Sequence, residues 1–170
     1  MLFRSTGTLG LGWSTFVTGT GRIRVSDAYF RHGGDWVLTL DDQFTDGDPS
    51  MASAILTIDL SQEAGALLDF WWKEWNDENH PEDGVLISDD QGATWYRVFS
   101  FNDGPSTYRH DIVDIAPFAQ AHSLALSDIF QIRFQFYDES AYPTDGYSID
   151  EVRLRPLKTA GYVPPVLKNF

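Results

Sequence analysis

The stretch SDDQGATW, residues 88–95, decides the fold class of this chain. It lies between two strand-like segments, residues 85–88 and 94–101. Gly92 can adopt a positive φ angle, and the Asp90 carboxylate can accept hydrogen bonds from backbone N–H groups of its own turn. The stretch therefore predicts a tight β-hairpin, with Trp95 returning into the core as an anchor. Its structural residues are Ser88, Asp90, Gly92, Thr94 and Trp95.

The rest of the chain repeats this alternation of short apolar segments and turns, at a spacing of about ten residues. Residues 66–75 are apolar on nearly both faces, which marks a central strand. A short helix is favoured only within residues 117–126, where Pro117 stands near the start. We therefore predict an all-β fold, an antiparallel β-sandwich of jelly-roll type with about nine or ten strands. Strands are expected at residues 13–17, 22–25, 36–40, 52–60, 66–75, 85–88, 94–101, 108–115, 129–137 and 147–154.

The length and composition of the chain indicate one domain. A chain of 170 residues with 15% aromatic side chains can bury a sizeable core without disulfides. Residues 1–155 are predicted to form the jelly-roll domain. Residues 156–170 contain Pro156, Gly161, Pro164 and Pro165, so we expect a C-terminal tail or linker there.

The net charge of the chain limits the classes of partner that it is expected to bind. Acidic residues outnumber basic ones by 25 to 12, for a net charge of −13, which opposes nucleic acid and anionic membranes and suits cation binding. The absence of cysteine excludes disulfides and thiolate metal sites. No segment has the apolar length of a membrane span, so we expect no membrane insertion. The start lacks the apolar core of a signal peptide, so any export signal is not part of this chain.

Residues 88–95 resemble the Asp-box, a β-hairpin motif that sialidase propellers repeat and that other β folds contain singly. One copy in a chain of 170 residues does not close a six-bladed propeller, so no sialidase residue is carried over. The resemblance implies a folding device and no catalytic group.

A wider resemblance extends over residues 12–155. The segments that carry it are Gly12–Trp13, Trp36–Asp42, Ala66–Trp72, Asp83–Val85 with the hairpin, and Asp145–Val152. Together they resemble the MAM-like and related jelly-roll modules of bacterial secreted multidomain proteins. The resemblance implies a non-catalytic module for adhesion, ligand binding or folding support, outside the cell or on its surface. The chain differs from animal MAM domains, which carry paired cysteines.

Two acidic strand ends predict a cation site. Asp42 shares a strand face with Leu38 and Leu40, and Asp150 shares one with Val152 and Leu154, so both carboxylates should point toward the core. A buried carboxylate is costly unless it is hydrogen-bonded or bound to a metal. A structural Ca²⁺ ion would satisfy both, as the resemblance to jelly-roll modules also implies, and hydrogen bonds to loop N–H groups are the alternative. The candidate ligands are Asp42 and Asp150, then Asp41 and Glu151.

The loop NDENHPED, residues 76–83, is a second candidate site. Glu78 with His80 and Asp83 has groups that hold a metal or act as acid and base, but the spacing matches no metalloprotease motif. A solvated surface loop is the alternative interpretation of these residues.

Aromatic side chains suggest a glycan site, because sugars need apolar stacking and hydrogen bonds together. Trp71 and Trp75 lie on the opposite strand face from Phe70, and Tyr137 and Tyr142 flank an acidic loop. The alternative interpretation, which the apolar character of the strand favours, is that both of its faces are core. We therefore predict a binding module for a glycan or protein surface.

Two other functions remain open at this stage. The chain could be a self-assembling subunit of a surface fibre or layer, with its tail added to the sheet edge of a neighbour. Alternatively, it could be a glycan- or peptide-cleaving hydrolase, which requires Glu78 or Asp83 to face a second carboxylate across a cleft.

Overall fold

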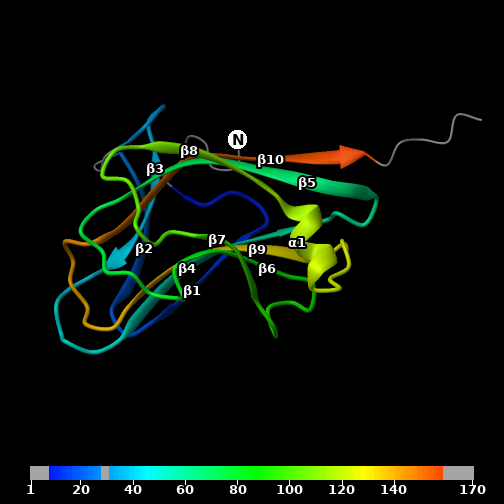
Figure 1. Ribbon diagram of the computed structural model, residues 1–170. Helices are drawn as coiled ribbons and strands as arrows, with labels where there is room; N and C mark the ends of the chain where they lie inside the picture. The colour runs from blue at the N-terminus through cyan, green and yellow to red at the C-terminus, as the bar shows by residue number, and fades with distance from the viewer. Residues whose placement is uncertain (1–7, 28–30, 159–170) are drawn as a thin grey trace, which may run out of the picture.

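The computed structural model describes residues 8–27 and 31–158. These residues form a sandwich of two antiparallel five-stranded sheets, as Figure 1 shows. The first sheet has the strand order β1-β4-β9-β6-β7, and the second has the order β2-β3-β10-β5-β8. The antiparallel β-sandwich predicted from the sequence is thereby confirmed. The elements are β1 (Trp13–Thr18), β2 (Gly21–Ser26), β3 (Val37–Asp42), β4 (Ser50–Ile58), β5 (Glu63–Glu74), β6 (Gly84–Ser88), β7 (Tyr96–Ser100), β8 (Arg109–Asp114), α1 (Ile115–Ala121), β9 (Phe130–Asp138) and β10 (Gly146–Lys158).

The core fills the space between the two sheets with aromatic and aliphatic side chains. Alternate residues of β9, Ile132, Phe134 and Phe136, are fully buried and face Phe70 and Trp72 of β5. Phe70 contacts Phe134 edge to face, with 5.5 Å between the ring centroids. Burial of each such side chain contributes roughly 1.5–3 kcal/mol, so this interface holds the sheets together.

The two ends of the sandwich differ. Helix α1 lies at one end, where the Asp114 side chain caps it by accepting a hydrogen bond from the Ala116 N–H at 3.1 Å. Figure 1 shows loops 43–49, 75–83 and 139–145 gathered at the opposite end. That loop end is rich in carboxylates, among them Asp42, Asp138 and Asp145.

A β-bulge interrupts strand β10. Its pairing with β5 shifts between Asp150 and Arg153, and Glu151 has a φ angle of 49°. Ile149 and Val152 therefore both face the core although they are three residues apart. Asp150 lies on the outer face, opposite Trp71, so its predicted position toward the core beside Val152 is wrong. The extra residue of the bulge reverses the strand phase from which that position was inferred.

The C-terminal boundary differs from the predicted one. Strand β10 continues through Pro156 to Lys158 and pairs with the start of β5, so these residues belong to the sheet. Residues 159–170, the remainder of the expected tail, lie outside the described residues. Among the described residues, no helix is long and apolar enough to cross a membrane.

Candidate functional site

Three loops are tied together at the end of the sandwich opposite α1. The Ala141 N–H donates to the Asp48 carbonyl at 3.4 Å, which joins loop 139–145 to loop 43–49. The Trp75 N–H donates to the Gly146 carbonyl at 3.0 Å, at the start of loop 75–83. These bonds bring together side chains that lie far apart in the sequence.

Three buried carboxylates meet between these loops. Oxygen atoms of Asp42, Asp138 and Asp145 lie within 4.8 Å of one another. Thr20 and Ser50 donate hydroxyl hydrogen bonds to Asp42 Oδ1. Asp42 Oδ2 and Asp145 Oδ1 accept no hydrogen bond from the described part of the chain. Buried polar atoms without hydrogen-bond partners cost free energy, and most proteins contain few of them. The two unpaired oxygens therefore distinguish this acidic cluster from an ordinary buried hydrogen-bond network.

The carboxylates of the acidic cluster oppose one another electrostatically. Burial raises the pKa of Asp42 to about 6, and the charge of Asp138 adds to the rise. Burial, followed by the charge of Asp138, also raises the pKa of Asp145 to about 7. None of the three forms a salt bridge with a described lysine or arginine. A bound cation would remove both the repulsion and the unpaired oxygens.

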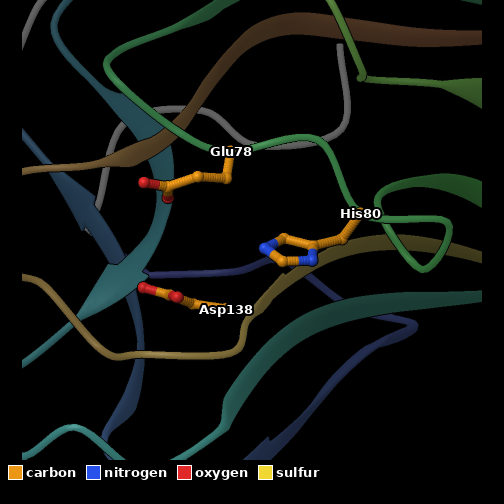
Figure 2. A group of neighbouring side chains, drawn as sticks. All are labelled: Glu78, His80 and Asp138. Carbon is orange, nitrogen blue, oxygen red and sulfur yellow. The ribbon is translucent and has the colours of Figure 1, made fainter.

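A second ligand set shares Asp138. Figure 2 shows the imidazole of His80 directed into the space between the carboxylates of Glu78 and Asp138. The three offered ligand atoms lie within 4.8 Å of one another. His80 is buried, its Nε2 has no hydrogen-bond partner among the described residues, and its ring packs edge-on against Tyr137. The sequence prediction that Glu78 and His80 act together therefore has a geometric counterpart.

Asp83, the third residue of that predicted set, has other partners. Its Oδ1 accepts the Tyr137 N–H at 2.7 Å, and its Oδ2 accepts the Tyr147 hydroxyl at 3.3 Å. Burial raises its pKa to about 7, and burial together with the charge of Asp83 raises the pKa of Asp77 to about 9. Asp83 thus ties loop 75–83 to strands β9 and β10.

The structure does not bring the predicted metal ligands together. The register pairs Gly146 with Asp41 and Ile149 with Leu38, so Asp42 and Asp150 lie about five residue positions apart along the sheet, roughly 17 Å. Asp150 accepts the N–H groups of His32 and Gly33 at 2.8 and 3.0 Å, which is the hydrogen-bonded alternative left open above. Asp41 binds Arg22 and Arg24. Glu151 pairs with His32 and Arg153.

The predicted aromatic residues do not form one platform. Trp71 lies on the outer face of the second sheet, stacked between His32 and His110 with centroid distances of 3.8 and 4.9 Å. Both faces of its indole are therefore covered. Tyr137 lies on the outer face of the first sheet, because it alternates with the core residue Phe136. Trp75 is half-buried after β5, and Tyr142 is exposed in loop 139–145.

A pocket of about 390 Å³ opens on the outer face of the first sheet. Its wall contains the ring of Phe16, which is 48% exposed, and the half-buried indole of Trp95. Arg133 lies between them, with its guanidinium 5.5 Å from the Phe16 ring and 5.1 Å from the Trp95 ring. The remaining lining residues are Ser14, Thr15, Ile55, Gln91, Gly92 and Gln131. Aromatic surface flanked by hydroxyl and amide groups is what a sugar ring requires.

The hairpin 88–95 places Trp95 in this pocket. The Thr94 N–H donates to Asp90 Oδ1 at 2.9 Å, and the Ser88 hydroxyl donates to the same atom at 2.7 Å. Gly92 has a φ angle of 84°, and a side chain there would meet the Trp95 ring at 3.0 Å. The predicted turn is therefore present, but the prediction that Trp95 anchors the core is wrong. Its indole covers the outer face of the sheet.

Sequence reasoning missed Phe16 and Arg133 as pocket residues. The outward position of Arg133 follows from the alternation of Ile132, Phe134 and Phe136 in its strand. The position of Arg133 beside Phe16 and Trp95 depends on strand pairing, such as that of β1 with β4 and of β4 with β9. No local sequence pattern specifies those partners.

Comparisons with known proteins agree on the fold. No family model matches the chain, and a search of curated proteins finds no match. Among solved structures, the chain is similar to the CBM22-1 xylan-binding domain of Xyn10C from Paenibacillus barcinonensis, with 14% identity over 88% of each chain and a TM-score of 0.53. It is similar to TmCBM61, solved in complex with β-1,4-galactotriose, with 14% identity over 86% of this chain and 89% of that one and a TM-score of 0.51.

A third similar structure is the family 11 carbohydrate-binding module of Clostridium thermocellum, in complex with a β-1,3-1,4-mixed-linked tetrasaccharide. It shares 12% identity over 88% of this chain and 90% of that one, with a TM-score of 0.50. These three structural neighbours are carbohydrate-binding modules.

Proposed function

We propose that this chain is a non-catalytic glycan-binding module of a secreted or cell-surface protein. The observation that carries the proposal is the pocket formed by Phe16, Trp95 and Arg133 on the outer face of the first sheet. Its volume of about 390 Å³ suits a small ligand. Three structural neighbours are carbohydrate-binding modules, which supports a glycan as the class of ligand.

The chemistry of the pocket matches a saccharide better than a purely apolar ligand. The rings of Phe16 and Trp95 offer faces for the C–H groups of a pyranose. Gln91, Gln131 and Ser14 contribute amide and hydroxyl groups beside those rings. The Gln131 amide nitrogen donates to the Thr57 hydroxyl at 3.2 Å, which fixes the side chain in the wall of the pocket.

The lining of the pocket favours binding without catalysis. Hydrolysis of a glycosidic bond ordinarily requires two carboxyl groups flanking that bond. No aspartate or glutamate lines the described pocket. The carboxylates with raised pKa values, among them Asp83 and Asp145, belong to the loop end and are not lining residues. A hydrolase would need its acid and base beside the bound sugar.

A structural cation is the second part of the proposal. We place Ca²⁺ at Asp42, Asp138 and Asp145, because these three buried carboxylates include two oxygens without donors. Ca²⁺ takes oxygen ligands and tolerates irregular geometry. The adjacent Glu78–His80–Asp138 set offers a nitrogen ligand and is better suited to Zn²⁺. Elemental analysis of the purified protein separates the two, and protein free of both metals would contradict the cation.

Glycan binding is tested by titration of oligosaccharides against the protein and three variants. Trp95→Ala and Phe16→Ala each remove one ring of the pocket, and we expect each to weaken binding roughly tenfold, about 1.4 kcal/mol. Tyr142→Ala is the control, because it removes an exposed aromatic ring in loop 139–145, outside the lining of the pocket. Binding that depends on Tyr142 and not on Trp95 would contradict the proposed site. The unfolding midpoint of each variant shows whether it has kept the fold.

A further inference from the structure

Arg133 is a buried cation with no carboxylate partner among the residues that the structure describes. Its residue is only 9% exposed. Its Nε donates to the Ser53 hydroxyl at 2.9 Å, and its Nη2 lies 2.9 Å from the Met51 sulfur. Neither partner is charged, and no salt bridge joins Arg133 to an acidic side chain of the described residues. Burial of an unpaired charge is costly, so this position calls for an explanation.

Three other arginines in the strands pair with carboxylates. Arg22 and Arg24 bind Asp41, and Arg155 binds Asp69. In a chain with 25 acidic residues, carboxylates are plentiful. The strands around Arg133 instead place neutral side chains near it, such as Ser53 and Gln131. The lack of an acidic partner for Arg133 therefore reflects the residues that surround this pocket. The amino-acid composition of the chain does not explain it.

The neighbouring rings hold the guanidinium without neutralising it. Phe16 and Trp95 both lie within cation–π range of Arg133. Burial lowers the pKa of Arg133 to about 10, so the group keeps its positive charge at neutral pH. A bound anion would find a charged donor already held in position beside two aromatic rings.

We propose that the pocket is selective for acidic saccharides, with the sugar carboxylate bound by the Arg133 guanidinium and the sugar ring against Phe16 or Trp95. This inference rests on the proposed function, since it names the class of glycan that the same pocket takes. The favoured ligand is a uronate residue, because a carboxylate matches the planar donor pattern of arginine.

The test compares uronate oligosaccharides with their carboxyl-reduced counterparts. Oligomers of galacturonate, glucuronate and mannuronate are titrated by calorimetry, each beside the neutral oligomer made by reducing its carboxyl groups. The two members of a pair share linkage and ring stereochemistry, so their difference isolates the charge. We expect at least one uronate to bind the unaltered protein tenfold or more tightly than its neutral counterpart. Sulfated oligomers form a separate arm and show whether a sulfate ester replaces the carboxylate.

Variants of Arg133 test whether its guanidinium recognises the carboxylate of the sugar. Arg133→Gln removes the charge, and we expect the uronate preference to disappear. Arg133→Lys keeps the positive charge but lacks the planar guanidinium, so part of the preference for the uronate should remain. Arg97→Gln is the control, because Arg97 is exposed on β7, donates to the Pro81 carbonyl at 2.7 Å and does not line the pocket. Circular dichroism confirms folding of each variant, and the comparison in the unaltered protein needs no variant.

Each outcome has a separate meaning. Equal binding of a uronate and its reduced form, abolished by Trp95→Ala, would overturn the acidic preference and leave glycan binding intact. Failure of the unaltered protein to bind any oligomer, neutral or acidic, would overturn both proposals. Binding of an acidic peptide in place of the uronates would keep the anion site and overturn the saccharide assignment.

Discussion

At the scale of single residues, the carboxylates of the acidic cluster repel one another unless a cation or protons neutralise them. Asp42, Asp138 and Asp145 are buried beside one another, and two of their oxygens have no donor among the described residues. Without a cation, protonation is the remaining way to reduce the repulsion. A cation bound at the proposed site would therefore compete with protons for the same carboxylates.

The first prediction concerns Ca²⁺ and Asp42. Ca²⁺ in hundredfold excess over its Kd should stabilise the folded protein by ~2.7 kcal/mol, which raises the unfolding midpoint by roughly 5–10 °C. Asp42→Asn should abolish this rise, because the amide removes one ligand charge. Asp150→Asn is the matched control and should keep the rise, since Asp150 binds the N–H groups of His32 and Gly33. A rise lost only in Asp150→Asn would refute the placement of the ion.

The second prediction concerns pH in the presence of a chelator. The folded-state pKa values of Asp42 and Asp145, about 6 and about 7, exceed the ordinary value of 3.8. Between pH 4 and 7 the folded state therefore binds more protons than the unfolded state, and stability falls as pH rises. We expect the metal-free midpoint to fall by several degrees from pH 5 to pH 8, and saturating Ca²⁺ to reduce the fall. A part should remain, because Asp77 and Asp83 also have raised pKa values and are not ligands of the proposed ion. A metal-free midpoint that rises over this interval would contradict the acidic cluster.

The sequence predicted individual residues well only where strand phase was regular. Asp42 faces the core as its strand phase predicted, with 0% exposure. Asp150 does not, because the bulge at Glu151 adds one residue to β10 and the sequence around it shows no break. Arg133 could be placed on an outer face by its phase, but its partnership with Trp95 could not. That contact arises from pairings between strands far apart in the chain.

At the scale of elements, strand positions were predictable and their partners were not. The alternation of apolar residues and turns located all ten observed strands to within a few residues. The sequence predicts acidic loops at residues 76–83 and 138–146, but their meeting depends on β5 and β10 being neighbours. Long-range pairing of this kind is decided by the packing of the whole core, which no local pattern records.

The third prediction concerns the pairing of β6 with β7. Gly84 has a φ angle of 146°, and a Cβ atom there would lie 2.0 Å from the Phe99 carbonyl oxygen. Gly84→Ala should therefore lower the free energy of unfolding by more than about 3 kcal/mol. Gly47→Ala is the control, because Gly47 has a φ angle of 78° with nothing within 4 Å, and it should cost only about 1–2 kcal/mol. Urea unfolding measures both, and equal costs would show that the contact with β7 is unimportant.

At the scale of the whole molecule, the net charge opposes the anionic ligand that we propose for the pocket. The chain carries −13, whereas the proposed saccharide is an anion. Long-range repulsion should then slow the approach of the ligand, although Arg133 would attract it at short range. Affinity and association rate should consequently respond differently to salt.

The fourth prediction follows from that repulsion. The Debye length falls from about 30 Å at 0.01 M salt to about 8 Å at 0.15 M. We expect the association rate constant of a uronate oligomer to rise severalfold over this range as the repulsion is screened. The carboxyl-reduced oligomer serves as the control and should show no change. Stopped-flow measurements that find a falling rate for the uronate would mean that the local field of the pocket outweighs the charge of the molecule.

The position of β10 has a consequence for how the protein comes to be folded during synthesis. This strand, residues 146–158, lies between β3 and β5 and joins the two halves of the second sheet. Until β10 has left the ribosome, β3 with β2 and β5 with β8 have no shared partner, and their open edges cannot close into one sheet. The second sheet therefore forms only after most of the domain has been synthesised, although the strands of the first sheet have all been made by then.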